Sequence, residues 1–187
     1  MPKTPAKAGE MKDEWLRAYR LAFDNQHVRL SDETSERLVF RVTLGMQGCF
    51  AELIFPKPSP EVGAVSLEAG YRGGVYRTIF DGDIVNRQKR GAGDWRGYVS
   101  LVARRHVPMQ VPDAIRPVID ASSGLIGTVE TKRGTIRARM LLRADLVPGS
   151  MAELPGGMVC RIVGLEHTGD SRNQPWYTDI FGYAEDG

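Results

Sequence analysis

Short segments in which apolar and polar residues alternate constrain the fold of this chain more than any other feature. In RLVFRVTL (37–44) every second residue is apolar, and Arg37, Arg41 and Thr43 lie between. Because successive side chains of a β-strand point to opposite faces of the sheet, this period of two predicts a strand with one buried and one exposed face.

Similar segments recur along the chain and end at turns rich in Gly, Pro or Asn, for which 21 glycines and 11 prolines are available. We expect strands in the second half of 15–23, and at 37–44, 49–55, 64–71, 75–80, 94–103, 135–143, 150–154, 158–167 and 176–184. In the last third of the chain every connection between them is short, which favours sequential antiparallel pairing.

One internal stretch breaks the pattern. Residues 104–124 contain three prolines and no clean alternation, which predicts a linker or extended arm. The sequence therefore predicts two small antiparallel β-barrel or sandwich domains at 13–103 and 125–187. Residues 1–12 are polar and Lys/Pro-rich, and we expect them to form a flexible or partner-bound arm.

Composition excludes some classes of protein. The net charge is only +2, from 25 basic and 23 acidic residues, whereas a dedicated nucleic-acid binder usually carries a basic surplus. No segment approaches the roughly 20 apolar residues of a membrane helix, and the N-terminus lacks the apolar run of a signal peptide. Cys49 and Cys160 are far apart and are predicted to be buried thiols in a reducing compartment.

The stretch LEHTGDSRNQPWYTDIFGYA (165–184) brings His167, Asp170 and Arg172 within six residues, followed by Trp176. It could be a catalytic or metal-binding constellation, or the turn and return strand of a β-hairpin. A working site needs groups converging from several elements, and Asp is favoured in turns because its carboxylate accepts local backbone hydrogen bonds. We therefore predict a structural hairpin, and no catalytic, cofactor-binding or metal-binding residues.

Two other functions remain open. A nucleic-acid-binding β-barrel could use the cations of 135–143 with stacking aromatics such as Trp95 and Tyr98. An enzyme could act through His167 and Asp170. The glycines of GYRGGVY (70–76) do not support a phosphate loop, because a strand rather than a helix follows them.

The order of these segments resembles the baseplate (tail) hub proteins of tailed bacteriophages. The first half carries the resemblance in ERLVFRVTL, AELIFPKPSPE and VSLEAGYRGGVYRTIFDGDIVNRQKRG. The second half carries it in LIGTVETKRGTIRARMLLRADLVPGSMAEL and in the ending that contains His167, Gly169, Asp170, Arg172, Trp176, Tyr177 and Thr178.

This resemblance implies a non-enzymatic structural protein with two tail-tube-like domains per chain, forming a ring that continues the tail tube and its DNA channel. Two departures leave open whether it is a hub or a tube-to-hub adaptor. The segment 104–124 is shorter than the domains that hub proteins usually insert there, and Arg143-Ala144 replaces an expected Asn-Pro.

The implied location is the virion, in the distal tail baseplate, after synthesis in the bacterial cytoplasm. Expected partners are further copies of the chain (a trimer first, a hexamer second), the tail tube protein, and other hub or spike proteins. DNA would pass only as cargo during ejection, no membrane anchoring is expected, and no cofactor is implied. Because a basic channel would retard DNA, we expect a neutral to acidic lining, with Arg137, Arg139 and Arg143 mostly outside it.

Overall fold

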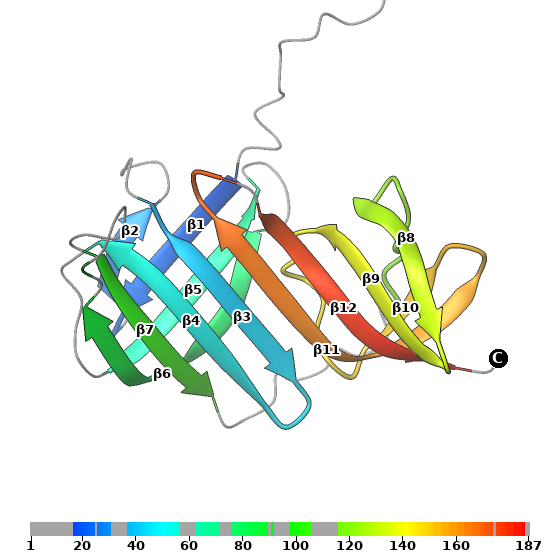
Figure 1. The fold of residues 1–187 in the computed structure, drawn as a ribbon, viewed down its shortest axis with the longest axis horizontal. Coiled ribbons are helices and arrows are strands. Elements are labelled where there is room, and N and C mark those ends of the chain that lie inside the picture. Colours follow the sequence, from blue (N-terminus) through cyan, green and yellow to red (C-terminus); the bar gives the residue numbers. More distant parts are fainter. Residues whose placement is uncertain are drawn as a thin grey trace, which may run out of the picture.

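The computed structural model describes residues 17–24, 26–30, 37–56, 63–71, 76–89, 91, 98–105, 116–173 and 175–185. Regular structure in these ranges consists of β-strands (Figure 1), and they hold no helix long and apolar enough to span a membrane. The predicted arm at 1–12, the glycine turn at 72–74 and residues 106–115 of the predicted linker lie outside the described residues.

The strands fall into two groups along the chain. The first group is β1 (Arg17–Phe23), β2 (Gln26–Leu30), β3 (Val39–Gly45), β4 (Gly48–Pro56), β5 (Ala64–Tyr71), β6 (Tyr76–Lys89) and β7 (Tyr98–Arg105). The second group is β8 (Leu125–Lys132), β9 (Thr135–Leu141), β10 (Met151–Leu154), β11 (Met158–Asp170) and β12 (Trp176–Ala184).

All twelve strands belong to one sheet. Their order is β2-β1-β5-β6-β7-β4-β3-β11-β12-β9-β8, and β10 pairs with β11 off this path. Strand β3 of the first group pairs antiparallel with β11 of the second, from Val39 opposite Asp170 to Gly45 opposite Gly164. This ladder joins the two halves of the chain, and β3, β11 and β12 run side by side in the middle of Figure 1.

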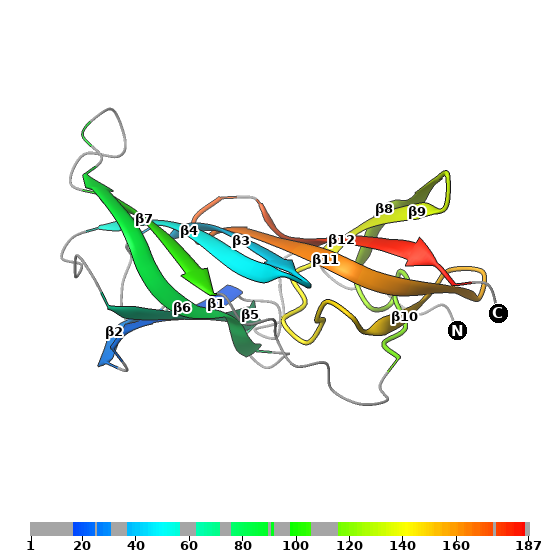
Figure 2. The same ribbon diagram turned by 90° about the horizontal axis from the view of Figure 1, so that it is seen from below.

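The sheet curls over itself in the first half. Figure 2 shows β3, β4 and β7 in one layer and β1, β2 and β5 in the other, with β6 connecting them. The rings of Phe23 on β1 and Phe55 on β4 meet across this interior, with centroids 5.5 Å apart. In the second half, β10 and the preceding turns lie beneath β11 and β12. Both interiors fill with the apolar side chains of alternating positions.

The layer that contains β3, β4 and β7, uppermost in Figure 2, has one side that none of the described strands covers. We call this side the outer face; it consists of the outward side chains of β7, β4, β3, β11, β12, β9 and β8, with the adjoining part of β6. Alternation assigns its members: on β3, Arg41 and Thr43 are exposed whereas Phe40, Val42 and Leu44 are buried. The outer face is therefore the polar half of the period-two pattern.

The structure confirms the expected all-β antiparallel fold class. It also adds two strands that the pattern did not predict, β2 and β8. The residues of β8 are half-buried or exposed on both sides, so this strand has no buried face to impose alternation on its sequence. Strand β6 continues without a break from the predicted strand at 75–80 through residues 81–89.

The predicted linker needs correction at its start and end. Arg104 and Arg105 belong to β7, where they pair with Phe50 and Cys49. Val118 forms a parallel bridge with Glu153 of β10, and Ile119 is fully buried. The division into domains at 13–103 and 125–187 stays a prediction, although one ladder of hydrogen bonds crosses it. Cys49 and Cys160 are buried, as predicted, and no disulfide joins them.

Candidate functional site

Asp170, at the end of β11, fixes the turn that closes the last hairpin. Arg37 donates to both of its carboxylate oxygens, from Nε at 3.1 Å and from Nη2 at 2.6 Å. The amides of Arg172 and Asn173 donate to Oδ1 at 3.0 and 3.2 Å. Burial opposes ionisation of Asp170, but the hydrogen bonds from Arg37 and from these amides prevail and lower its pKa. The carboxylate is thus saturated by structural partners.

The same turn is held from the first half of the chain. Ser171 exchanges backbone and side-chain hydrogen bonds with Leu38, both at 2.9 Å. Arg17 of β1 donates to the carbonyls of Asp170 and Asn173, and its guanidinium lies 5.7 Å from the ring centroid of Trp176. The turn and its neighbours therefore form a junction between the two halves, which we call the junction cluster: Arg17, Arg37, Leu38, Phe40, Gly70, Gly169, Asp170, Ser171 and Trp176.

Trp176 is the apolar centre of the junction cluster. It is 3 % exposed, its indole N–H donates to the Gly70 carbonyl at 3.2 Å, and its ring meets Phe40 edge-on at 5.2 Å. These two rings lie over Gly169, which is opposite both residues in the ladder. A Cβ at Gly169 would lie 2.2 Å from the Phe40 ring, so the packing requires glycine there.

His167 points away from the turn, into the core. It is 1 % exposed, and its Nδ1 lies 2.8 Å from Thr178 Oγ1. The Thr178 hydroxyl accepts from the Arg143 amide at 3.0 Å, so its own proton can be donated to the imidazole. Burial lowers the pKa of His167 to about 4, although attraction to Asp145 acts in the opposite direction. The imidazole is therefore neutral at pH 7.

The three residues of the suspected constellation do not converge on a reacting centre. His167 faces the core, the Asp170 carboxylate is occupied by Arg37 and turn amides, and the Arg172 side chain is exposed in the turn. Among the residues that the structure describes, no three His, Cys, Asp or Glu side chains gather as a metal site requires. These hydrogen bonds and the ion pair instead hold the two halves of the sheet together.

The outer face carries a second, different arrangement. Its four arginines on β3, β7 and β9 each lie directly opposite a carboxylate on the neighbouring strand. The pairs are Arg41 with Glu52, Arg104 with Asp83, Arg137 with Glu130, and Arg139 with Asp179. Opposite charges in this cross-strand position attract, since their Cβ atoms are only about 5 Å apart.

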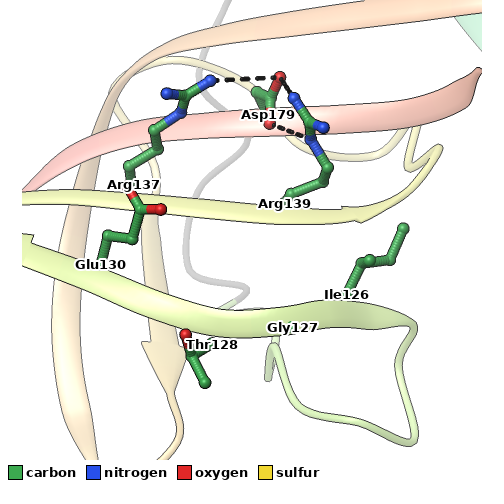
Figure 3. Close-up of a pocket in the computed structure, with 7 residues that line it drawn as sticks. All are labelled: Ile126, Gly127, Thr128, Glu130, Arg137, Arg139 and Asp179. Atoms are coloured by element: carbon green, nitrogen blue, oxygen red, sulfur yellow. Dashed lines mark hydrogen bonds and ion pairs between the residues drawn. The ribbon is translucent and has the colours of Figure 1, made fainter.

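Asp179 is the tightest part of this arrangement (Figure 3). Arg139 donates to its two oxygens at 2.8 and 2.9 Å, and Arg137 Nη2 lies 3.9 Å from Oδ2. The two guanidiniums also lie over aromatic rings of β12, Arg139 over Tyr177 at 4.1 Å and Arg137 over Phe181 at 5.6 Å. Beside them is a pocket of about 400 Å³ bounded by the β8 bulge.

The sequence did not indicate these partners. It predicted the shared face of Arg137 and Arg139, and the structure confirms that alternation. Arg143 differs, because it turns back to Asp145 in a half-buried ion pair at 2.6 Å. Arg17 and Arg37 come from distant segments, and their convergence on Asp170 depends on the β3–β11 pairing. The period of two identified the faces, but strand order decides which charges meet.

Solved structures that share this fold include two proteins of tail-related systems. The tail protein from Neisseria meningitidis MC58 is 10 % identical, with a TM-score of 0.56 over 92 % of this chain and 98 % of that one. The E. coli c3393 protein is 8 % identical, with a TM-score of 0.53 over 89 % of this chain and 77 % of that one. It is a component of the type VI secretion system and is structurally similar to the bacteriophage T4 tail proteins gp27 and gp5.

No protein-family model and no curated protein matches the sequence. At 8–10 % identity the two structural matches define the fold alone. That fold is the all-β, antiparallel architecture of tail-type proteins.

Proposed function

We propose that this chain is a non-enzymatic structural component of a bacteriophage tail, a baseplate hub or a tube-to-hub adaptor ring at the distal end of the tail tube. The observation that carries the proposal is the fold, which two proteins of tails and tail-like machines share over nearly the whole chain. Similar order of the strand segments in hub proteins supports the same assignment. Its place is then the virion, around the channel through which DNA leaves.

Assembly is the chemistry that such a role requires. The sheet is open, and its terminal strands β2 and β8 each have a neighbour on one side only within the described chain. Unpaired strand edges present free N–H and C=O groups, which favour addition of another chain. Closing a ring would satisfy these groups and bury further apolar surface.

We expect three copies in the ring. If each half of the chain acts as one tube-like unit, a trimer presents six units and matches a six-fold tube; a hexamer is the second candidate. Light scattering coupled to size exclusion, with negative-stain electron microscopy, should show three-membered rings with a central pore. A monomer that persists at high concentration would refute the ring.

A matched pair of variants tests the role of the β8 edge. Ile126 is 43 % exposed on this terminal strand, and Ile126→Lys introduces the residue with which natural proteins block strand edges. Val85 is 59 % exposed on β6, which has neighbours on both sides. Ile126→Lys should weaken assembly and Val85→Lys should not; equal behaviour would exclude β8 as a ring contact.

A type VI secretion apparatus is the second candidate setting, because one of the two structural matches comes from that system. The same ring would then conduct or support a secreted spike rather than DNA. Co-purification of the tagged chain from its natural source distinguishes the settings, since phage particles contain DNA and capsid proteins and the secretion apparatus does not.

A further inference from the structure

The outer face contains the side chains from which nucleic-acid-binding surfaces are built. Guanidiniums of Arg104, Arg137 and Arg139 lie over aromatic rings at 5.2, 5.6 and 4.1 Å. Basic side chains interleaved with aromatics bind single strands with little sequence preference. Judged by its side-chain types alone, the outer face should bind a polyanion such as a nucleic acid.

Three of its arginines, Arg41, Arg137 and Arg139, are nevertheless ion-paired within the sheet. Each arginine in the four cross-strand pairs has a carboxylate directly opposite. Glu166 of β11 adds a fifth carboxylate and ion-pairs with Arg41 at 3.1 Å, so carboxylates outnumber arginines within this set. A phosphate that approached the guanidinium of Arg41, Arg137 or Arg139 would also meet a carboxylate.

Stability explains the arrangement only in part. Arg41, Arg137 and Arg139 have side chains 59 %, 52 % and 42 % exposed, and ion pairs open to water contribute only about 0–1 kcal/mol each. The Asp179 carboxylate differs, because it is 4 % exposed and its burial requires a cationic partner. Cancelling charge does change one property strongly, because affinity for DNA depends on the number of phosphates that free cations neutralise.

We propose that Asp179 and Glu166 are specificity-determining residues that prevent the outer face from binding nucleic acid. Asp179 holds Arg139 in a two-point contact and lies within 3.9 Å of Arg137, and Glu166 holds Arg41. In a DNA-containing tail the outer face would then not retain DNA, both if it lines the channel and if, as the sequence predicts for Arg137 and Arg139, it lies mostly outside the channel.

The test measures binding of fluorescently labelled single- and double-stranded DNA to the purified chain over a range of salt concentrations. The wild-type protein should bind weakly. Asp179→Asn and Glu166→Gln should each bind roughly three- to tenfold more tightly at low salt, and the slope of log affinity against log salt should steepen by about one for each arginine released.

Glu68→Gln is the matched control. Glu68 pairs with Arg20 at 3.3 Å and is 25 % exposed, close to the 24 % of Glu166, but it lies on β5 in the other layer. Each of these substitutions changes net charge equally and releases an arginine. Adding Arg139→Gln to Asp179→Asn should remove the gained affinity. If Asp179→Asn does not fold, Glu166→Gln still tests the proposal, because Glu166 is more exposed than Asp179.

Two results would overturn the proposal. One is tight, salt-sensitive DNA binding by the wild type, which would favour a nucleic-acid-binding protein. The other is equal affinity of Glu166→Gln and Glu68→Gln. The biological purpose of this property rests on the proposed function, but the measurement is made on the isolated chain, so it can fail while ring assembly succeeds, and the reverse.

Discussion

Among the described residues, Asp145, Asp170 and Asp179 each accept two-point hydrogen bonds from an arginine, and the surroundings of the last two give them different roles. Asp170 meets Arg37 where both side chains are largely buried, 5 % and 22 % exposed. Asp179 is as deeply buried, at 4 % exposure, but its partner Arg139 is 42 % exposed. Removing one partner of a buried pair leaves an unsatisfied charge, whereas water can solvate an exposed one. The first pair therefore contributes to the folding of the junction. In the second pair water reaches the arginine but not the carboxylate, so the pair sets surface charge and also compensates the buried Asp179.

Replacing Asp170 with Ala should lower the free energy of unfolding by about 2–3 kcal/mol. The turn hydrogen bonds alone predict about 1 kcal/mol, and loss of the Arg37 pair adds to it. Urea unfolding measures the difference. In the background of Arg37→Met, Asp170→Ala should cost less, and an unchanged cost would show that the two side chains are not coupled.

Acidification should destabilise the protein through His167. Its folded pKa of about 4 lies below the unfolded value of 6.5, so the unfolded chain binds the proton first. Stability therefore falls as pH drops from above 6.5 towards 4 and levels off below, by about 2 kcal/mol between pH 7 and pH 5.

His167→Gln tests the assignment of this pH dependence. Glutamine can still hydrogen-bond Thr178 but does not titrate. Its unfolding free energy should be nearly constant between pH 7 and pH 5. Retention of the full wild-type slope would assign the effect to another group.

At the scale of strands, the sequence predicted which side chains are buried but not which strands are neighbours in the sheet. Alternation predicted most strands because a half-buried strand must alternate, and β8 escaped prediction because it has no buried side. The candidate site was harder to predict. The turn role of Asp170 followed from its local sequence, whereas its contacts with Arg37 and Arg17 depend on partners more than 130 residues away.

Close strand packing at the junction makes Gly169 sensitive. A Cβ there would lie 2.2 Å from the Phe40 ring and 2.9 Å from Trp176, so Gly169→Ala must displace an aromatic pair of the core. We expect a loss of about 1–3 kcal/mol in unfolding free energy. A Cβ added at Gly91 would have no neighbouring atom of the described residues within 4 Å, and Gly91→Ala should change stability by less than about 0.5 kcal/mol. If Gly169→Ala and Gly91→Ala changed stability equally, the Phe40 and Trp176 rings could move away from residue 169 at no cost.

For the molecule as a whole, the β3–β11 ladder and the junction cluster couple the two halves. Separating them would expose one edge of β3 and of β11, break the Arg37–Asp170 pair and uncover Trp176. These losses occur together, so neither half should unfold while the other remains native.

This coupling predicts one transition for both halves. Leu53, on β4, and Met140, on β9, are fully buried in the first and second halves, and Leu53→Ala or Met140→Ala should each cost about 2–5 kcal/mol. Hydrogen exchange during urea unfolding can follow peptides from β5 and β9 separately. If the halves form one cooperative unit, either substitution moves both peptides to the same lower midpoint. Two independent domains would instead give two midpoints, with each substitution moving only the half that contains it.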